Sequence, residues 1–294
     1  MNDTFRPISK GAEEWLGHSV SVLDHGFIYL VDYMGDDLAI EEAARVSYGP
    51  GNKRVADSTG LIRYLMRHSH TSPFEMVELK FHVKMPIFVA RQWVRHRTAS
   101  MNEISGRYSV LPKEFYIPED NDIALQSETN NQGRGANASC TGKRTAKKYF
   151  VTDPESAFKH YDRLVNDLDI AKELGRIILP LSTYTEFYWK IDLHNLMHFL
   201  HLRMDSHAQF EIREYADIIA GIVEDGWPMA YSAFKDYVVK SERFSAEELR
   251  VLGVLMDDGS VEDITGLAAI IAEKSDLSSR EISEFVDKVK RIIQ

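Results

Sequence analysis

The strict alternation of apolar and polar residues between positions 77 and 85 restricts the folds open to this chain more than any other feature. Val77, Leu79, Phe81, Val83 and Met85 alternate there with two lysines, a glutamate and a histidine. Successive side chains of a β-strand point to opposite faces, so the pattern predicts a strand with one buried and one polar face. We therefore expect a sheet whose apolar face is covered.

Weaker patterns on both sides of this strand predict the rest of the fold. Residues 20–33 and 183–189 are rich in β-branched and aromatic side chains, which favours strands. Pro86 cannot continue a central strand but suits the first turn of a helix, so a helix is expected from Ile87 to about Arg97. The spacing of apolar residues predicts further helices over 37–48, 61–66, 153–168, 193–204 and 208–223. These elements together predict an α+β protein with a mostly antiparallel sheet flanked by helices.

Changes in composition and in apolar periodicity along the chain predict its domain organisation. Residues 1–19 form an irregular N-terminal extension and 20–240 form the main domain. Within that domain, 119–149 is polar, small and without periodicity, which is typical of a mobile loop; it is either a lid or a solvated segment. Residues 241–294 carry two capping-box patterns, Ser245–Glu248 and Ser278–Glu281, which predict a small helical C-terminal appendage.

Composition excludes several classes of protein. Acidic residues outnumber basic ones by 45 to 35, and the net charge of -10 argues against a nucleic-acid binder that must neutralise many phosphates. The first residues lack the apolar core of a signal peptide, and no run of eighteen apolar residues occurs, so we expect a cytoplasmic protein without a membrane partner. The single cysteine, Cys140, excludes an intramolecular disulfide and a thiolate-rich metal site.

The segment Arg91–Tyr108 concentrates the polar chemistry of the chain. It holds four arginines, a histidine, two serines, an asparagine and a glutamate in eighteen positions. Guanidinium groups suit phosphates and paired carbonyl oxygens, so the segment predicts a site for an anionic, oxygen-rich ligand such as a nucleotide. The alternative is a solvated amphipathic helix followed by a polar turn.

Two further patterns have both a catalytic and an ordinary interpretation. His194, His198 and His201 recur on one helical face with Asp205 following, as in a metal-dependent hydrolase, but the His-Glu-x-x-His motif is absent and we expect no metal. Ser105 lies among arginines that could activate a nucleophile. Because no base and orienting group accompany it, a hydrogen-bonding role is favoured.

The run Arg95-His96-Arg97, followed by Ser105 in the frame Arg-Gln-Trp-Val-Arg-His-Arg-x-x-Ser-x-Asn-Glu-x-Ser-x-Arg-Tyr, resembles the signature of the flavin-dependent thymidylate synthases. Further similar segments begin at Ala43, His70, Arg176 and Leu202, so the resemblance covers about residues 20–240. It implies a homotetramer with active sites shared between subunits. It also implies reductive methylation of dUMP to dTMP, for dTMP biosynthesis, with methylenetetrahydrofolate as carbon donor and NADPH, through bound FAD, as hydride donor.

The resemblance also assigns roles to residues of this chain. Arg203 is the expected catalytic residue: it lies against the uracil ring and favours ionisation at N3, so that C5 attacks without an enzyme nucleophile. The residues expected to bind dUMP are Gln92, Trp93, Val94, Arg95, Glu103, Ile104, Ser105, Gly106, Arg107, Arg176 and Arg203. Those expected to bind FAD are Ser72, Arg95, His96, Arg97, Asn102, Glu103, Asp192, Leu193, His194 and His198. Ser47, His70 and Glu75 align with residues on the flavin or folate side.

This chain departs from the common family pattern at three of these positions. Asp192 stands where an asparagine is common, His194 where some members have an arginine, and His198 where an asparagine occurs. A carboxylate near FAD phosphates is repulsive unless it is paired. A carboxylate at position 192 therefore needs a hydrogen-bonding or charged partner if it lies near the FAD phosphates.

Overall fold

The computed structural model describes residues 6–47, 57–128, 132–257 and 267–293. The chain divides into two compact units, Met1–Val239 and Lys240–Gln294. The first unit contains the sheet and the segments that the sequence assigns to the site. Of the helices in the described ranges, none is long and apolar enough to cross a membrane.

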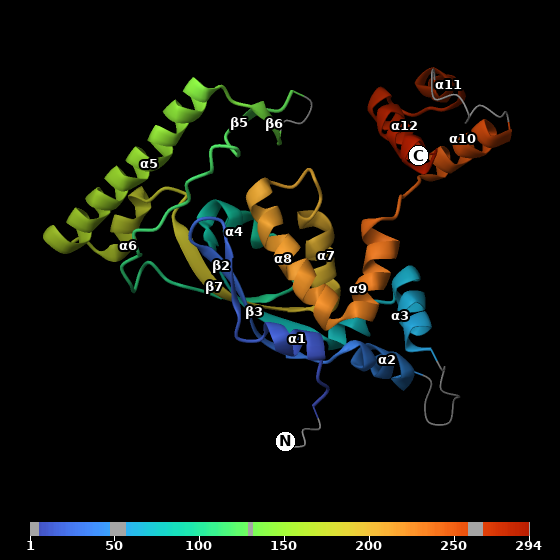
Figure 1. Ribbon diagram of the computed structural model, residues 1–294, viewed down its shortest axis with the longest axis horizontal. Coiled ribbons are helices and arrows are strands. Elements are labelled where there is room, and N and C mark those ends of the chain that lie inside the picture. The colour runs from blue at the N-terminus through green and yellow to red at the C-terminus, as the bar shows by residue number, and fades with distance from the viewer. Residues whose placement is uncertain (1–5, 48–56, 129–131, 258–266, 294) are drawn as a thin grey trace. The chain divides into compact units, whose positions relative to one another are not determined.

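A mixed α+β architecture with an antiparallel sheet organises the first unit (Figure 1). In the described residues the main sheet has the order β1-β2-β3-β7-β4, and each neighbouring pair is antiparallel. Its strands are β1 (Ser19–Val22), β2 (Gly26–Met34), β3 (Glu78–Pro86), β7 (Tyr184–Asp192) and β4 (Ser100–Glu103). The strands predicted over 77–85 and 183–189 are confirmed, since β3 buries its alternate apolar side chains completely.

The predicted strand region 20–33 is a hairpin of two strands. The turn between β1 and β2 places Leu23 in the left-handed region, with φ 58°. Gly26 begins β2 where a Cβ atom would lie 2.1 Å from Tyr215 Oη, so the chain passes too close to α8 (Phe210–Gly226) for a side chain. Composition favoured strand over the whole stretch but did not locate this turn.

Helices pack against the sheet to form the core. Trp93, Trp189 and Phe199 contact one another at ring-centroid distances of 4.6–5.2 Å and join α4 (Ile87–Trp93), β7 and α7 (Leu193–Arg203). α7, α8 and α9 (Pro228–Phe234) lie side by side (Figure 1). The remaining helices around the sheet are α1 (Lys10–Trp15), α2 (Asp37–Val46), α3 (Ser58–Arg67) and the short 3-10 helix η1 (Phe74–Met76).

The helix predicted to reach Arg97 ends earlier, at Trp93. The indole of Trp93 is fully buried. In the turn that follows, the Trp93 main-chain carbonyl accepts a hydrogen bond from the His96 amide, with an N–O distance of 3.0 Å. The helix therefore ends at its last core residue. Arg95, His96 and Arg97 lie on the segment between α4 and β4 and not on the helix, where they were expected.

The stretch 119–149 is not one loop. Its described residues include the hairpin of β5 (Ala124–Gln126) and β6 (Arg134–Asn137) and the start of α5 (Cys140–Asp162); residues 129–131 lie outside the described ranges. Ser139 caps α5 by accepting the Gly142 amide at 3.2 Å. The predicted start at Asp153–Pro154 was wrong, because Pro154 lies inside the helix.

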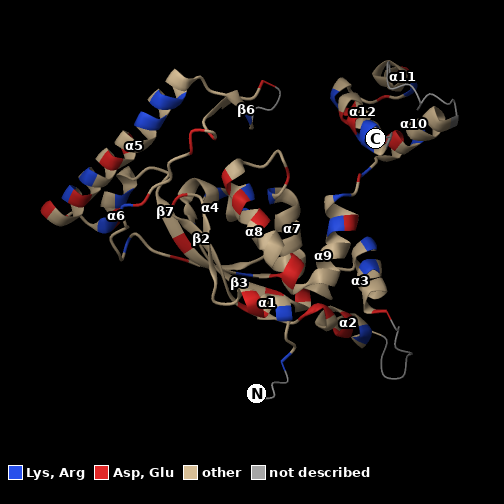
Figure 2. Cartoon of the chain, viewed as in Figure 1, with Lys and Arg blue, Asp and Glu red and all other residues tan. Residues whose placement is uncertain are grey.

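Basic residues gather in the first half of α5, where Lys147 pairs with Asp120 at 2.5 Å (Figure 2). The π-helical turn η2 (Arg163–Asp167), α6 (Lys172–Gly175) and the 3-10 helix η3 (Arg176–Ile178) return the chain from α5 to β7. This path places Arg176 beside the segment that follows β4.

The second unit has a small core of its own. Its described helices are α10 (Ala246–Asp257), α11 (Leu267–Lys274) and α12 (Ser279–Ile293), while the π-helical turn η4 (Lys235–Val239) ends the first unit. Both predicted capping boxes are confirmed: Ser245 and Glu248 exchange backbone and side-chain hydrogen bonds, and so do Ser278 and Glu281. The core residues are Val251, Leu255, Leu267, Ile271, Phe285, Val286 and Val289.

Candidate active site

The segment after α4 and one face of α7 enclose an open cavity of about 510 Å³. All three residues of the Arg-His-Arg motif line it, and so does Arg203, which lies more than a hundred residues further along the chain. The lining residues are Arg95, His96, Arg97, Thr98, Ile191, Asn195, His198, Leu202 and Arg203.

Arg203 and His96 form the central contact of this cavity. The Arg203 Nε–H donates to His96 Nε2 at 3.0 Å, and Arg203 Nη2 lies 3.4 Å from the Gln92 carbonyl oxygen. Burial lowers the pKa of His96 to about 4, and the positive charges of Arg203 and His198 add to this effect. His96 is therefore neutral near pH 7 and can accept the Arg203 hydrogen bond. Burial also lowers the pKa of Arg203, whose guanidinium stays charged.

Two predicted site residues, Trp93 and Leu193, point their side chains into the core and not toward a ligand. The indole of Trp93 and the side chain of Leu193 are both buried in the core. A ligand could reach only the main chain of these two residues. Val94 is half-buried at the end of α4.

A second group of predicted site residues lies at the open edge of the sheet. β4 pairs only with β7 among the described strands, and its residues are exposed. Thr185 Oγ1 donates to the Glu103 carboxylate, which fixes the end of β4. Asn102 lies on the same strand and Ile104 continues it, with its amide bonded to the Glu186 carbonyl at 2.9 Å. The position of Ser105 is thus set by the end of the edge strand β4.

Ser105, Gly106 and Arg107 form a tight turn against Arg176. Ser105 Oγ accepts the Arg107 amide at 3.3 Å. A Cβ atom at Gly106 would lie 3.3 Å from Arg176 Cδ and 3.1 Å from Leu111 Cδ1, so a larger residue here would require these side chains to shift by a few tenths of an ångström. Arg107 pairs with Glu173 at 3.4 Å. The turn therefore places two arginines on one side of the sheet edge.

Asp192 has a structural partner within its own helix. Its carboxylate accepts the Asn195 amide at 2.9 Å and the Asn195 side chain at 2.8 Å. This is an N-cap, and it gives the Asp192 carboxylate a partner within the protein. His194 follows in the first turn of α7 and is half-buried.

Ser72, which was expected to bind FAD, and the three residues expected on the flavin or folate side do not line the Arg203 cavity of this chain. Ser47 ends α2, while His70, Ser72 and Glu75 lie between α3 and β3. The His70 ring is 5.8 Å from that of Tyr64. None of these four described residues lines the cavity.

The histidine face of α7 does not form a metal site. Among the residues that the structure describes, no group of three or more His, Cys, Asp or Glu side chains could hold a metal ion. His198 instead faces His96, with ring centroids 6.0 Å apart. The geometry required for the metal-dependent hydrolase is therefore missing from this part of the chain.

Several lining residues were not predicted from the sequence. Asn195 and Leu202 lie three residues before and four residues after His198, so helical spacing alone could have identified them. Thr98 follows directly on the arginine motif. Ile191 had no comparable signal, because it resembles any other alternate residue of a buried strand.

Comparisons with known proteins identify the family to which this chain belongs. Residues 29–229 match the family described as thymidylate synthase complementing protein. A flavin-dependent thymidylate synthase from Ruegeria pomeroyi is 49% identical over 293 residues, which span 98% of this chain and 93% of that protein. One from Wolbachia pipientis is 46% identical and covers 97% and 98% of the two chains. The chain belongs to the flavin-dependent thymidylate synthase family.

A solved structure extends this conclusion to the fold. The UMP/dUMP methylase PolB from Streptomyces cacaoi, bound with 5-Br dUMP, is 34% identical to this chain with a TM-score of 0.68. It matches over its whole length and over 76% of this chain. The relatives from bacteria named above match almost all of it, so their similarity extends beyond the 20–240 range that the motifs indicated. The chain is thus an enzyme of the flavin-dependent thymidylate synthase family.

Proposed function

We propose that this enzyme converts dUMP to dTMP by reductive methylation. Methylenetetrahydrofolate supplies the carbon, NADPH supplies the hydride through bound FAD, and no side chain acts as a nucleophile. The observation that carries the proposal is the Arg203 guanidinium, held in a cavity by neutral His96 and by the Gln92 carbonyl. The dUMP methylase relative supports the choice of substrate.

Arg203 provides the electrostatic part of the proposed mechanism. Its charge is partly buried, and charges act more strongly where water is excluded. Placed against a uracil ring, the guanidinium favours ionisation at N3, which enriches C5 with electrons. His96 holds this guanidinium in place without adding a competing charge, since its pKa lies well below neutral pH.

The cavity has the composition that a flavin site requires. Arg95 and Arg97 supply cationic donors for a pyrophosphate, Ile191 and Leu202 supply apolar wall, and Asn195 and His198 supply hydrogen-bonding groups. Its volume of about 510 Å³ falls within the range of roughly 300–1,000 Å³ typical of ligand sites. When bound there, the flavin supplies the hydride that reduces the transferred carbon to a methyl group.

Exposed apolar residues around Arg176 support the proposed homotetramer with shared sites. Six large apolar side chains between positions 168 and 181 are exposed, and an exposed apolar patch often marks a protein–protein interaction site. If a second copy covered this patch, Arg176, Gly106 and Arg107 of the first copy would lie next to the second copy and could contribute to its active site. The exposed residues are Leu168, Ile170, Leu174, Ile177, Ile178 and Leu181.

Anaerobic spectroscopy tests the cofactor assignment. The purified enzyme should show the absorbance of oxidised flavin near 450 nm, on the order of one flavin per chain, because the cavity offers one set of donors. NADPH should bleach this absorbance, and NADH should do so less effectively. A protein that neither retains added FAD nor bleaches with NADPH would disprove the flavin step.

A further inference from the structure

The buried carboxylate of Glu211 connects the predicted substrate residue Gln92 to the β5–β6 hairpin. Glu211 lies in the first turn of α8 and is only 2% exposed. Its Oε1 accepts from Arg134 Nη2 of β6, and its Oε2 accepts from Gln209 Nε2 at 2.9 Å. Burial raises the pKa of Tyr116, and the neighbouring Glu211 carboxylate adds to that effect. Three separate segments therefore converge on one carboxylate.

The chain of bonds continues from Gln209 to Gln92. Gln92 Nε2 donates to Gln209 Oε1. The side-chain path from Glu211 therefore ends at the Gln92 amide, whereas Arg203 Nη2 lies 3.4 Å from the main-chain carbonyl oxygen of the same residue. Every contact in this path joins described residues of the first unit.

The direction of these bonds is set by Glu211. A carboxylate accepts hydrogen bonds and does not donate them, whereas a glutamine amide has one accepting and one donating end. Gln209 must therefore turn its NH₂ group toward Glu211 and its oxygen toward Gln92. Gln92 must in turn direct its NH₂ group at Gln209, which leaves its own Oε1 turned away from this contact.

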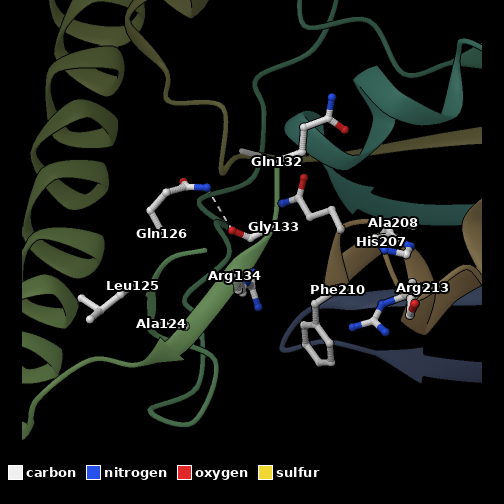
Figure 3. A pocket seen from close by; sticks show the side chains of 12 residues that line it. Ala124, Leu125, Gln126, Gln132, Gly133, Arg134, His207, Ala208, Phe210 and Arg213 are labelled. Carbon is white, nitrogen blue, oxygen red and sulfur yellow. Dashed lines mark hydrogen bonds between the residues drawn. The ribbon is translucent and has the colours of Figure 1, made fainter. Parts of the chain in front are cut away.

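The hairpin side of the network adjoins a second cavity, of about 410 Å³ (Figure 3). Arg134, held by Glu211, lies 5.4 Å from the centroid of the Phe210 ring. Gln126 of β5 donates to the Gly133 carbonyl at 3.1 Å and holds the two hairpin strands together. The Glu211 carboxylate therefore holds the side-chain amides of Gln209 and Gln92 on one side and Arg134, which lines this cavity, on the other.

We propose that Glu211 is a positioning residue for dUMP binding: it fixes the amide orientation of Gln209 and, through Gln209, that of Gln92. This inference rests on the proposed function, since it takes Gln92 as a substrate residue. Glu211 itself does not touch the substrate. Its effect should therefore appear in substrate affinity before it appears in the rate of the chemical step.

Steady-state kinetics of Glu211→Gln tests the proposal. The amide cannot accept from both Arg134 and Gln209, so the variant should raise the KM for dUMP roughly tenfold, as expected for one disrupted buried hydrogen bond, with a smaller change in kcat. Glu224→Gln, the same substitution at an exposed residue near the end of α8 that pairs with Lys235, should leave both constants near the wild-type values. Circular dichroism and retained flavin check that each variant is folded.

Gln209→Leu provides an independent variant if Glu211→Gln does not fold. It interrupts the path while leaving the Arg134–Glu211 pair, and it should also raise the KM for dUMP. In the double variant the two effects should not add, because both remove one path. Additive effects, or an unchanged KM in folded single variants, would overturn the inference. An inactive wild-type enzyme would instead count against the proposed function.

Discussion

At the scale of single residues, Arg203→Ala separates catalysis from cofactor binding. The proposed partner of the guanidinium is the uracil ring, so its removal should abolish dTMP formation, with a loss of at least about a hundredfold in rate. Flavin should remain bound, because Arg95, Arg97 and the polar groups of α7 are unchanged. Product analysis and the flavin spectrum of the same sample measure both properties. Loss of flavin would show that Arg203 belongs to the cofactor site instead.

His96 makes stability depend on pH in a definite direction. The folded protein keeps His96 neutral down to a pKa of about 4, whereas its ordinary value is 6.5. As the pH falls, the unfolded chain therefore binds a proton first, and the contribution of neutral His96 is lost between about pH 6.5 and 4. The melting temperature of the wild type should drop more between pH 7.5 and 5 than that of His96→Asn. Equal drops would contradict the assignment.

At the scale of elements, Asp192 determines how α7 begins. Asp192→Ala removes two bonds to Asn195 and should lower the free energy of unfolding by about 1 kcal/mol. Asp192→Asn keeps an N-cap and should change neither stability nor flavin affinity by much. Urea denaturation and flavin titration provide the two measurements. A large gain in flavin affinity for the asparagine variant would show that the carboxylate repels the cofactor.

Elements with a strong local pattern could be predicted from the sequence, and those decided by distant contacts could not. The alternation of β3 and the capping boxes of α10 and α12 depend on neighbouring residues, and each was found. The ends of α4 and α5 depend on where Trp93 is buried and on a proline that α5 tolerates. The sequence therefore predicted the elements more accurately than their boundaries.

The site shows the same division. Periodicity could identify a face of α7, and the arginine cluster indicated an anionic ligand. Only the resemblance to a family connected that cluster with Arg203, because their contact joins positions 107 residues apart. Glu211 gave no signal at all: a carboxylate on the apolar face of a helix is recognised only when its donors, Arg134 and Gln209, are seen.

At the scale of the whole molecule, the apolar patch around Arg176 should be an interface between copies of the chain. Ile177 is 73% exposed, so Ile177→Asp should leave the single chain folded while shifting tetramers toward smaller species. Activity should fall with assembly if Arg176 serves the site of a neighbour. Met256→Asp is the matched control, since Met256 is 68% exposed and belongs to the second unit. Light scattering that finds the Ile177 variant still tetrameric would place the interface elsewhere.

The most direct test of the central claim follows the hydrogen at C5 of the substrate. With tritium at that position of dUMP, the enzyme should release tritium to water and form dTMP only when NADPH and methylenetetrahydrofolate are both present. Arg203→Ala should release none above background under the same conditions. Tritium release and dTMP formation by the Arg203 variant at the wild-type rate, or no dTMP from the flavin-loaded wild type, would contradict the account.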